Sequence, residues 1–115
     1  MKYKGIIAFQ RELSFSQAQQ LREFLRDNKA CLEILPNGKG LQWDNKTITD
    51  QLENIIADAL QKFLLPWSLG ATGVITVGET KQEKKYDIVV VAKTVWVYDG
   101  KVKRIAYTNQ KYNQK

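Results

Sequence analysis

The chain has 115 residues, 43% of them hydrophobic and 26% charged, a composition that indicates a globular protein and excludes a disordered one. It contains no histidine, which excludes histidine-based catalytic triads and most catalytic zinc sites. The single cysteine cannot form an internal disulfide, and the formal net charge is +6. We expect one domain over residues 1–115, with residues 109–115 as a flexible basic tail.

The start of the chain predicts a strand followed by a capped helix. Tyr3–Arg11 is rich in strand-forming residues. Ser14 is then a candidate N-cap, with Gln17 three residues later as its capping-box partner, and the helix extends to about Asn28. Its predicted apolar side carries Phe15, Ala18, Leu21, Phe24 and Leu25.

A hairpin is predicted next. Cys31–Leu35 is an apolar run typical of a strand, in which the Cys31 thiol would be buried and reduced. Pro36–Gly40 has the residues of a turn, because proline presets the backbone and glycine accepts a positive φ. Leu41–Asp44 then predicts a short third strand.

The longest helical pattern covers Ile48–Leu65, with Thr47 or Thr49 as its cap and Pro66 at its end. The apolar positions at helical spacing are Ile48, Leu52, Ile55, Ile56, Ala59, Leu60, Phe63 and Leu64. No polar residue interrupts this face, so we expect it to pack on a sheet.

The remainder of the chain predicts β-structure. Strands are expected over Gly73–Gly78, Tyr86–Tyr98 and Lys101–Thr108, the last two joined by a hairpin turn at Asp99–Gly100. Because Tyr86–Tyr98 is long for one strand, Ala92–Thr94 is the place where a bend or a second turn would divide it in two.

This order, β-α-β-β-α-β-β-β, predicts an α+β two-layer sandwich: a mostly antiparallel sheet with two helices on one face, a ferredoxin-like variant being the nearest arrangement. An unbroken Tyr86–Tyr98 strand would place Val89, Val91, Val95 and Val97 on one face and Val90, Trp96 and Tyr98 on the other. Since both sets are apolar, an uncovered face would indicate a homodimer or ligand surface, unless loops or the tail cover it.

Several short segments together resemble small uncharacterised proteins of phages and bacterial genomes. They are Tyr3–Phe9 with Leu13-Ser14, Leu41–Asp44, Phe63–Trp67, Gly73–Glu79 and Ile88–Val90. In those proteins a Trp-Gly pair typically ends the long helix, whereas Ser68 follows Trp67 here. The resemblance implies a protein of phage or mobile-element type, with no established activity.

Enzyme motifs are missing from the sequence. Gly70–Gly73 and Gly78 lack the spacing of a dinucleotide fingerprint or a P-loop. Asp44 and Glu79 each follow or end a predicted strand and would be a catalytic carboxylate pair if the fold joined them, although two solvated charges explain them equally. We therefore expect a non-enzyme with no cofactor and no metal site.

Positive charge is concentrated in the second half of the chain. Residues 66–115 hold nine Lys/Arg and four Asp/Glu, against nine and eight in residues 1–65. Such an excess attracts anionic partners, although a solubilising tail explains it as well. An alternative function is therefore single-stranded nucleic-acid binding by Lys101, Lys103, Arg104, Tyr107, Lys111 and Tyr112.

The preferred function is a non-enzymatic interaction protein that binds and modulates a host or defence macromolecule. A protein partner is expected, anchored by Trp67, Trp96 and Tyr98, because tryptophan and tyrosine dominate binding energy at such surfaces. Trp67 directly after Pro66 has the alternative role of a lid on the core. The first apolar stretch is too short for a signal peptide or a membrane span, so we expect a cytoplasmic location, bacterial or host, away from membranes.

Overall fold

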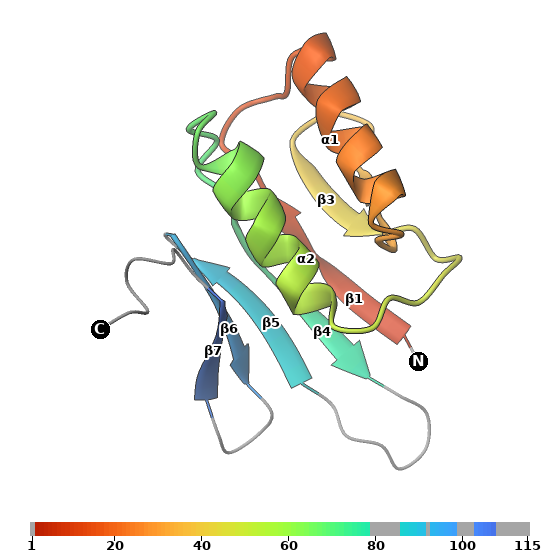
Figure 1. Cartoon of the computed structure of the whole chain (residues 1–115), viewed down its shortest axis with the longest axis vertical. Helices are drawn as coiled ribbons and strands as arrows, with labels where there is room; N and C mark the ends of the chain where they lie inside the picture. Colours follow the sequence, from red (N-terminus) through yellow and green to blue (C-terminus); the bar gives the residue numbers. More distant parts are fainter. Residues whose placement is uncertain (1, 79–85, 92, 99–102, 108–115) are drawn as a thin grey trace.

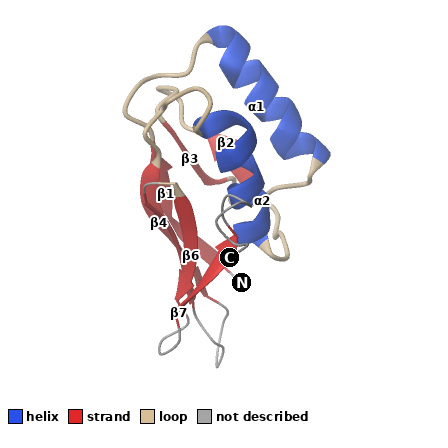
Figure 2. Ribbon diagram, turned by 60° about the vertical axis from the view of Figure 1, so that its left-hand side comes forward, coloured by secondary structure: helices blue, strands red, loops and turns tan. Residues whose placement is uncertain are grey.

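The computed structural model describes residues 2–78, 86–91, 93–98 and 103–107, the last of these by its backbone. In chain order, its elements are β1 (Lys2–Ala8), α1 (Phe15–Asp27), β2 (Leu32–Ile34), β3 (Gly40–Trp43), α2 (Leu52–Ala59), the π-helix η1 (Leu60–Leu64), β4 (Thr72–Gly78), β5 (Tyr86–Val91), β6 (Thr94–Tyr98) and β7 (Lys103–Tyr107). The described strands form one antiparallel sheet, and both helices lie on the same face of it (Figures 1 and 2). The predicted two-layer α+β sandwich is confirmed.

The strand order across the sheet is β2-β3-β1-β4-β5-β6-β7. In the first four strands, the helical connection from β1 to β2 passes over β3, which is the split β-α-β arrangement of ferredoxin-like folds. The strands β5, β6 and β7 then extend the sheet beyond β4 by successive antiparallel neighbours (Figure 1). Each covering helix lies over a different end of the sheet, α1 against β2 and α2 against β6 and β7.

The first helix begins where the sequence predicts. The Ser14 hydroxyl accepts a hydrogen bond from the Gln17 N–H at 3.1 Å, and the Gln17 side chain accepts one from the Ser14 N–H at 3.0 Å. Leu21 and Leu25 are buried as expected. Phe15, by contrast, is 83% exposed, so its predicted place on the apolar side is wrong. At about 100° per residue, it lies roughly a quarter turn from the line through Leu21 and Leu25.

The second helix begins at Leu52, so the predicted start at Ile48 is wrong. Ile48 is 54% exposed, and neither Thr47 nor Thr49 caps the helix. The residue before the helix, Gln51, has a left-handed backbone with φ 53°, which an α-helix cannot include. The chain therefore turns sharply at Gln51.

The loop before this helix is held by Asp44 and Thr49. One Asp44 carboxylate oxygen accepts from the backbone N–H groups of Lys46 at 2.8 Å and Thr47 at 3.1 Å. Thr49 is buried, and its hydroxyl donates to the Lys29 carbonyl at 2.9 Å, just after α1. The Thr47 hydroxyl donates to the other Asp44 oxygen at 3.1 Å, so both threonine hydroxyls that the sequence offered as a cap are bonded within this loop or to Lys29.

Tyr3 fastens the same loop to the sheet. Its buried hydroxyl donates to the Thr49 carbonyl at 3.1 Å and accepts from the Thr49 N–H at 3.2 Å. Burial of this hydroxyl raises the pKa of Tyr3 to about 12. The phenol therefore stays protonated and links β1 to a residue far along the chain.

The end of the second helix has π-helical hydrogen bonding. The Leu65 N–H donates to the Leu60 carbonyl at 2.9 Å, five residues back. The chain then leaves the helix through a left-handed Ser68, where the Leu69 N–H donates to the Leu64 carbonyl at 3.1 Å and the Ser68 N–H to the Leu65 carbonyl at 2.9 Å, as in a Schellman motif. The predicted core positions Leu52, Ile56, Ala59, Leu60 and Leu64 are nevertheless buried. The expected packing of this segment on the sheet is thus confirmed.

The segment Tyr86–Tyr98 consists of two strands, as the second of the two sequence interpretations predicts. Val91 pairs with Thr94, so the chain reverses direction between them and exchanges the two faces. The predicted grouping of the valines is therefore wrong. Ile88, Val90, Val95 and Val97 are buried under the helices, whereas Val89, Val91, Trp96 and Tyr98 lie on the opposite face.

The helices and the covered face of the sheet together make the core. Ile7, Ile75, Ile88 and Val95 from the sheet are each 0% exposed. The Cys31 thiol is free and buried in the same cluster, as expected. The predicted turn at Asp99–Gly100 and tail at residues 109–115 lie outside the described residues.

Candidate functional site

An apolar row crosses the sheet on the face opposite the helices. Ile6 pairs with Val74, Val74 with Val89, and Val89 with Trp96. Directly paired residues of antiparallel strands point to the same side, so these side chains form a continuous row from β1 to β6. Ile6 and Val74 are 43% and 42% exposed, and none of the described helices or strands covers them (Figure 2).

Val91 and Tyr98 flank this row on the same face, at 47% and 40% exposure. Of the six exposed large hydrophobic residues in the described part of the chain, four lie here, the others being Phe15 and Ile48. Such gathering distinguishes the face from scattered surface hydrophobics, which need no explanation. We call this surface the open face, made of Ile6, Val74, Val89, Val91, Trp96 and Tyr98.

Polar groups surround the open face. Lys2 and Lys4 are exposed on β1 at alternate positions with Ile6, so they point to the same side. Two carboxylates on this side each accept a hydrogen bond from a neutral neighbour, Asp87 from Thr76 at 2.7 Å and Glu33 from Gln42 at 2.8 Å. The open face thus has an apolar centre with charged groups at its margin.

The structure places Trp67 away from Trp96 and Tyr98, on the helix layer. Its ring lies 5.2 Å from that of Phe63, which in turn lies 5.3 Å from Phe24. Trp67 is half-buried and packs against the core. These contacts fit the alternative role of a lid, and they separate Trp67 from the two aromatic residues on the open face.

The residues of the nucleic-acid alternative fall partly in β7. In the register of that strand with β6, Lys103 pairs with Tyr98, Arg104 with Val97, and Tyr107 with Val95. The β7 backbone therefore lies beside the strand that carries Trp96 and Tyr98. Lys101, Lys111 and Tyr112 lie outside the described residues.

Asp44 does not have the properties of a catalytic acid. Burial acts to raise its pKa, but the hydrogen bonds from Lys46 and Thr47 outweigh this, and the pKa stays below its usual value. Its proposed partner Glu79 lies outside the described residues. Within the described ranges, no three His, Cys, Asp or Glu side chains come together as ligands for a metal ion. No helix there has the length and apolar composition that crossing a bilayer requires.

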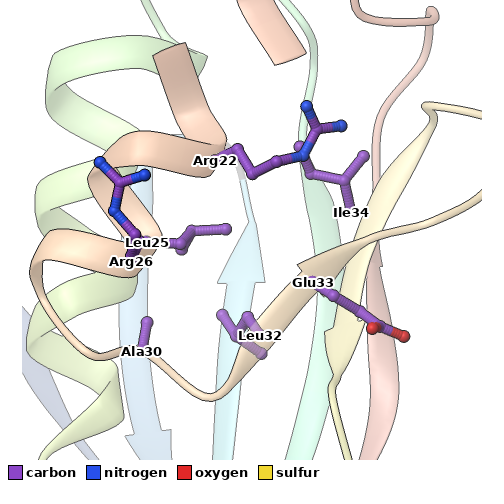
Figure 3. Close-up of a pocket in the computed structure, with 7 residues that line it drawn as sticks. All are labelled: Arg22, Leu25, Arg26, Ala30, Leu32, Glu33 and Ile34. Carbon is purple, nitrogen blue, oxygen red and sulfur yellow. The ribbon is translucent and has the colours of Figure 1, made fainter. Parts of the chain in front are cut away.

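A second surface was not predicted from the sequence. A hollow of about 370 Å³ lies between the C-terminal half of α1 and β2, with Arg22 and Arg26 on its helix side (Figure 3). The signal that could have identified it is the spacing of these arginines, because residues four apart share one side of a helix.

Comparison with known proteins gives no relative: no protein-family model, no curated protein and no solved structure matches the chain.

Proposed function

We propose that the chain is a non-enzymatic interaction protein whose open face binds a protein partner. The observation that supports this most is the apolar row Ile6–Val74–Val89–Trp96, which no described element covers. Removing such a surface from water is the main favourable term in protein association. Trp96 and Tyr98 supply the kind of aromatic anchors that contribute most to binding energy.

The centre of the open face favours a protein over a nucleic acid. Ile6, Val74 and Val89 are aliphatic, so they pack against another apolar surface but offer no ring on which a base could stack. The margin of the open face carries both signs of charge, with Lys2 and Lys4 against Glu33 and Asp87, but the net charge of +6 favours an acidic partner. The same charge disfavours a second copy of this chain.

The proposal includes a biological setting. The chain would be a protein of phage or mobile-element type that binds and modulates a host or defence macromolecule in the cytoplasm. Support for this part comes from the sequence resemblance and not from the site.

Site-specific photo-crosslinking tests the proposal. A benzophenone amino acid replaces Val74 on the open face, and in a control variant it replaces Ser16, which is exposed on α1. After irradiation in native host cells, we expect Val74 to give a discrete, nuclease-resistant protein adduct and Ser16 to give none. Equal adducts at both positions, or none at Val74, would contradict the proposal. A nuclease-sensitive adduct would favour nucleic acid, and an adduct of twice the chain mass would indicate a homodimer.

A second candidate function is single-stranded nucleic-acid binding. It is favoured by the position of Trp96 and Tyr98 on the open face, where Tyr98 pairs with the β7 residue Lys103. Aromatic rings beside cations suit stacked bases and phosphates. A submicromolar Kd is typical of specific nucleic-acid binding. If the protein bound oligo(dT) that tightly at physiological salt, this function would rank above protein binding.

A further inference from the structure

The groove between α1 and β2 has an apolar floor and a basic wall. Besides Arg22 and Arg26, its lining consists of Leu25, Ala30, Leu32, Ile34 and one acidic residue, Glu33. Arg22 reaches from α1 toward Ile34, whereas the Glu33 side chain points away from both arginines (Figure 3). Glu33 is also engaged with Gln42 on the other face of the sheet, so it does not neutralise the groove.

The outer edge of β2 offers unpaired backbone groups to this groove. The Leu35 N–H donates to the Gly40 carbonyl, and the Asp44 N–H donates to the Cys31 carbonyl, so these positions face β3. Hydrogen-bonded and non-hydrogen-bonded pairs alternate in an antiparallel ladder, so Leu32 and Ile34 direct their N–H and C=O groups outward. Within the described residues, β2 is the last strand at this side of the sheet.

The basic residues of the groove lack strong internal partners. Arg26 makes one long ion pair with Asp27, at 3.4 Å, and in the described part of the chain Arg22 makes none. A second hollow continues the groove past Arg26 to Lys29 and Asp44. Asp44 is ionised and adds a negative charge at that end, but Arg22, Arg26 and Lys29 along the two hollows outweigh it, so the groove as a whole favours an anion.

We propose that this groove binds an extended, acidic segment of a partner protein, which adds to β2 as a further antiparallel or parallel strand. Its backbone would pair with Leu32 and Ile34, and its acidic side chains would meet Arg22 and Arg26. Arg22 and Arg26 are four residues apart, which is about 6 Å along the helix axis, and alternate residues of an added strand are about 6.6 Å apart. Acidic residues at alternate positions of a strand running along α1 would therefore match the spacing of the two arginines.

Charge also argues against an occupant from this chain's own C-terminal region. From Gly100 onward the sequence has five cations and no carboxylate. The groove lies on the helix side of the sheet and the open face on the other, so this proposal does not depend on the proposed function.

The charge requirement is tested with a fluorescein-labelled peptide in which glutamate alternates with valine and threonine, and with its glutamine counterpart. Fluorescence anisotropy should show weaker binding, by at least about tenfold, for the double variant Arg22→Gln, Arg26→Gln. The control Lys39→Gln, Lys93→Gln removes the same charge away from the groove and should bind like the unchanged protein. Equal loss in the control, or equal binding of the glutamine peptide, would overturn the proposal.

The strand requirement is tested with Ile34→Pro against Ile34→Ala. Both remove the isoleucine side chain, but only proline removes the outward N–H, and it leaves the pairing with β3 intact. We expect Ile34→Pro to bind the acidic peptide several-fold more weakly than Ile34→Ala, with thermal unfolding showing that both are folded. Equal affinities of the two variants would exclude strand addition. If Ile34→Pro does not fold, a peptide N-methylated at alternate backbone amides replaces it, and undiminished binding of that peptide would overturn the proposal.

Discussion

The two faces of the sheet carry the same kinds of side chain but differ in what lies over them. Ile75 is 0% exposed under the helices, whereas its neighbour Val74 is 42% exposed on the open face. Neighbouring residues of a strand point to opposite sides, so a single strand supplies both surfaces. Apolar residues alone therefore do not distinguish a core from a binding surface, and the helical connections decide which face is which.

The largest difference between the faces is expected from a buried charge. Ile75→Asp places an unpaired carboxylate in the core and should cost about 4 kcal/mol or more, enough to unfold a marginally stable domain. Val74→Asp, one residue away, should cost about 1 kcal/mol or less, since its carboxylate stays hydrated. Thermal unfolding by circular dichroism measures both. Similar losses would mean that the open face is covered.

A milder exchange sharpens the comparison. Val77→Thr with Val90→Thr buries two hydroxyl groups on the covered face and should cost about 2–4 kcal/mol. Val74→Thr with Val89→Thr on the open face should change the free energy of unfolding by about 1 kcal/mol or less. It should also weaken partner binding at least about tenfold, because it removes the apolar centre. Urea unfolding measures the effect on stability. Titration calorimetry with the partner that crosslinking identifies measures the effect on affinity. Unchanged affinity would contradict the role of the row.

A tyrosine on each face gives a third comparison, Tyr3 on the covered face and Tyr98 on the open face. Tyr3→Phe leaves the N–H and C=O of Thr49 without their hydroxyl partner and should cost about 1–3 kcal/mol. Tyr98→Phe on the open face is the matched control, for which a smaller loss is expected. Urea unfolding at neutral pH gives both values, and equal losses would mean that the Tyr3–Thr49 contact is not stabilising.

The Tyr3 hydroxyl also predicts a pH dependence. Its pKa is about 12 in the folded protein and about 10 when unfolded, so the folded state binds the proton more tightly. The contribution to stability is complete below pH 10 and is lost as the pH rises from 10 through 12. The free energy of unfolding should therefore fall more steeply over this pH range for the unchanged protein than for Tyr3→Phe. Parallel curves would contradict the assigned burial.

The smallest effect is expected from the basic residues of β7. We expect oligo(dT) to bind weakly and only through its phosphate charges. The double variant Lys103→Ala, Arg104→Ala should then make oligo(dT) binding less dependent on salt, while partner binding at the open face stays unchanged. Anisotropy over a salt series measures this. A large loss of partner binding would instead assign these residues to the principal interface.

The parts of the fold governed by local signals could be predicted from the sequence. The Ser14–Gln17 capping box and the long apolar pattern through Ile56 depend on nearby residues, and both are confirmed. The start of α2 could not be predicted in this way. Thr49 is bound by Tyr3 and Lys29, which lie 46 and 20 residues away, and no local pattern carries that information.

The candidate site was predictable only in part. Apolar residues on both sides of Tyr86–Tyr98 indicated a surface besides the core, but their assignment to faces depended on the reversal between Val91 and Thr94. Ile6 and Val74 complete the row only through pairing of β1 with β4, more than sixty residues apart in the sequence. Trp67 was a reasonable anchor by residue type, yet its place is set by its packing on Phe63.

Solvent accessibility of the valine methyl groups tests the central claim most directly. With a neutral nitroxide in solution, NMR relaxation should be strong for the methyl groups of Val74 and Val89 and weak for those of Val77 and Val90. Adding the protein captured by crosslinking should protect Val74 and Val89 and leave the others unchanged. Protection of Val74 and Val89 in the free monomer, or their continued exposure in the complex, would contradict the account.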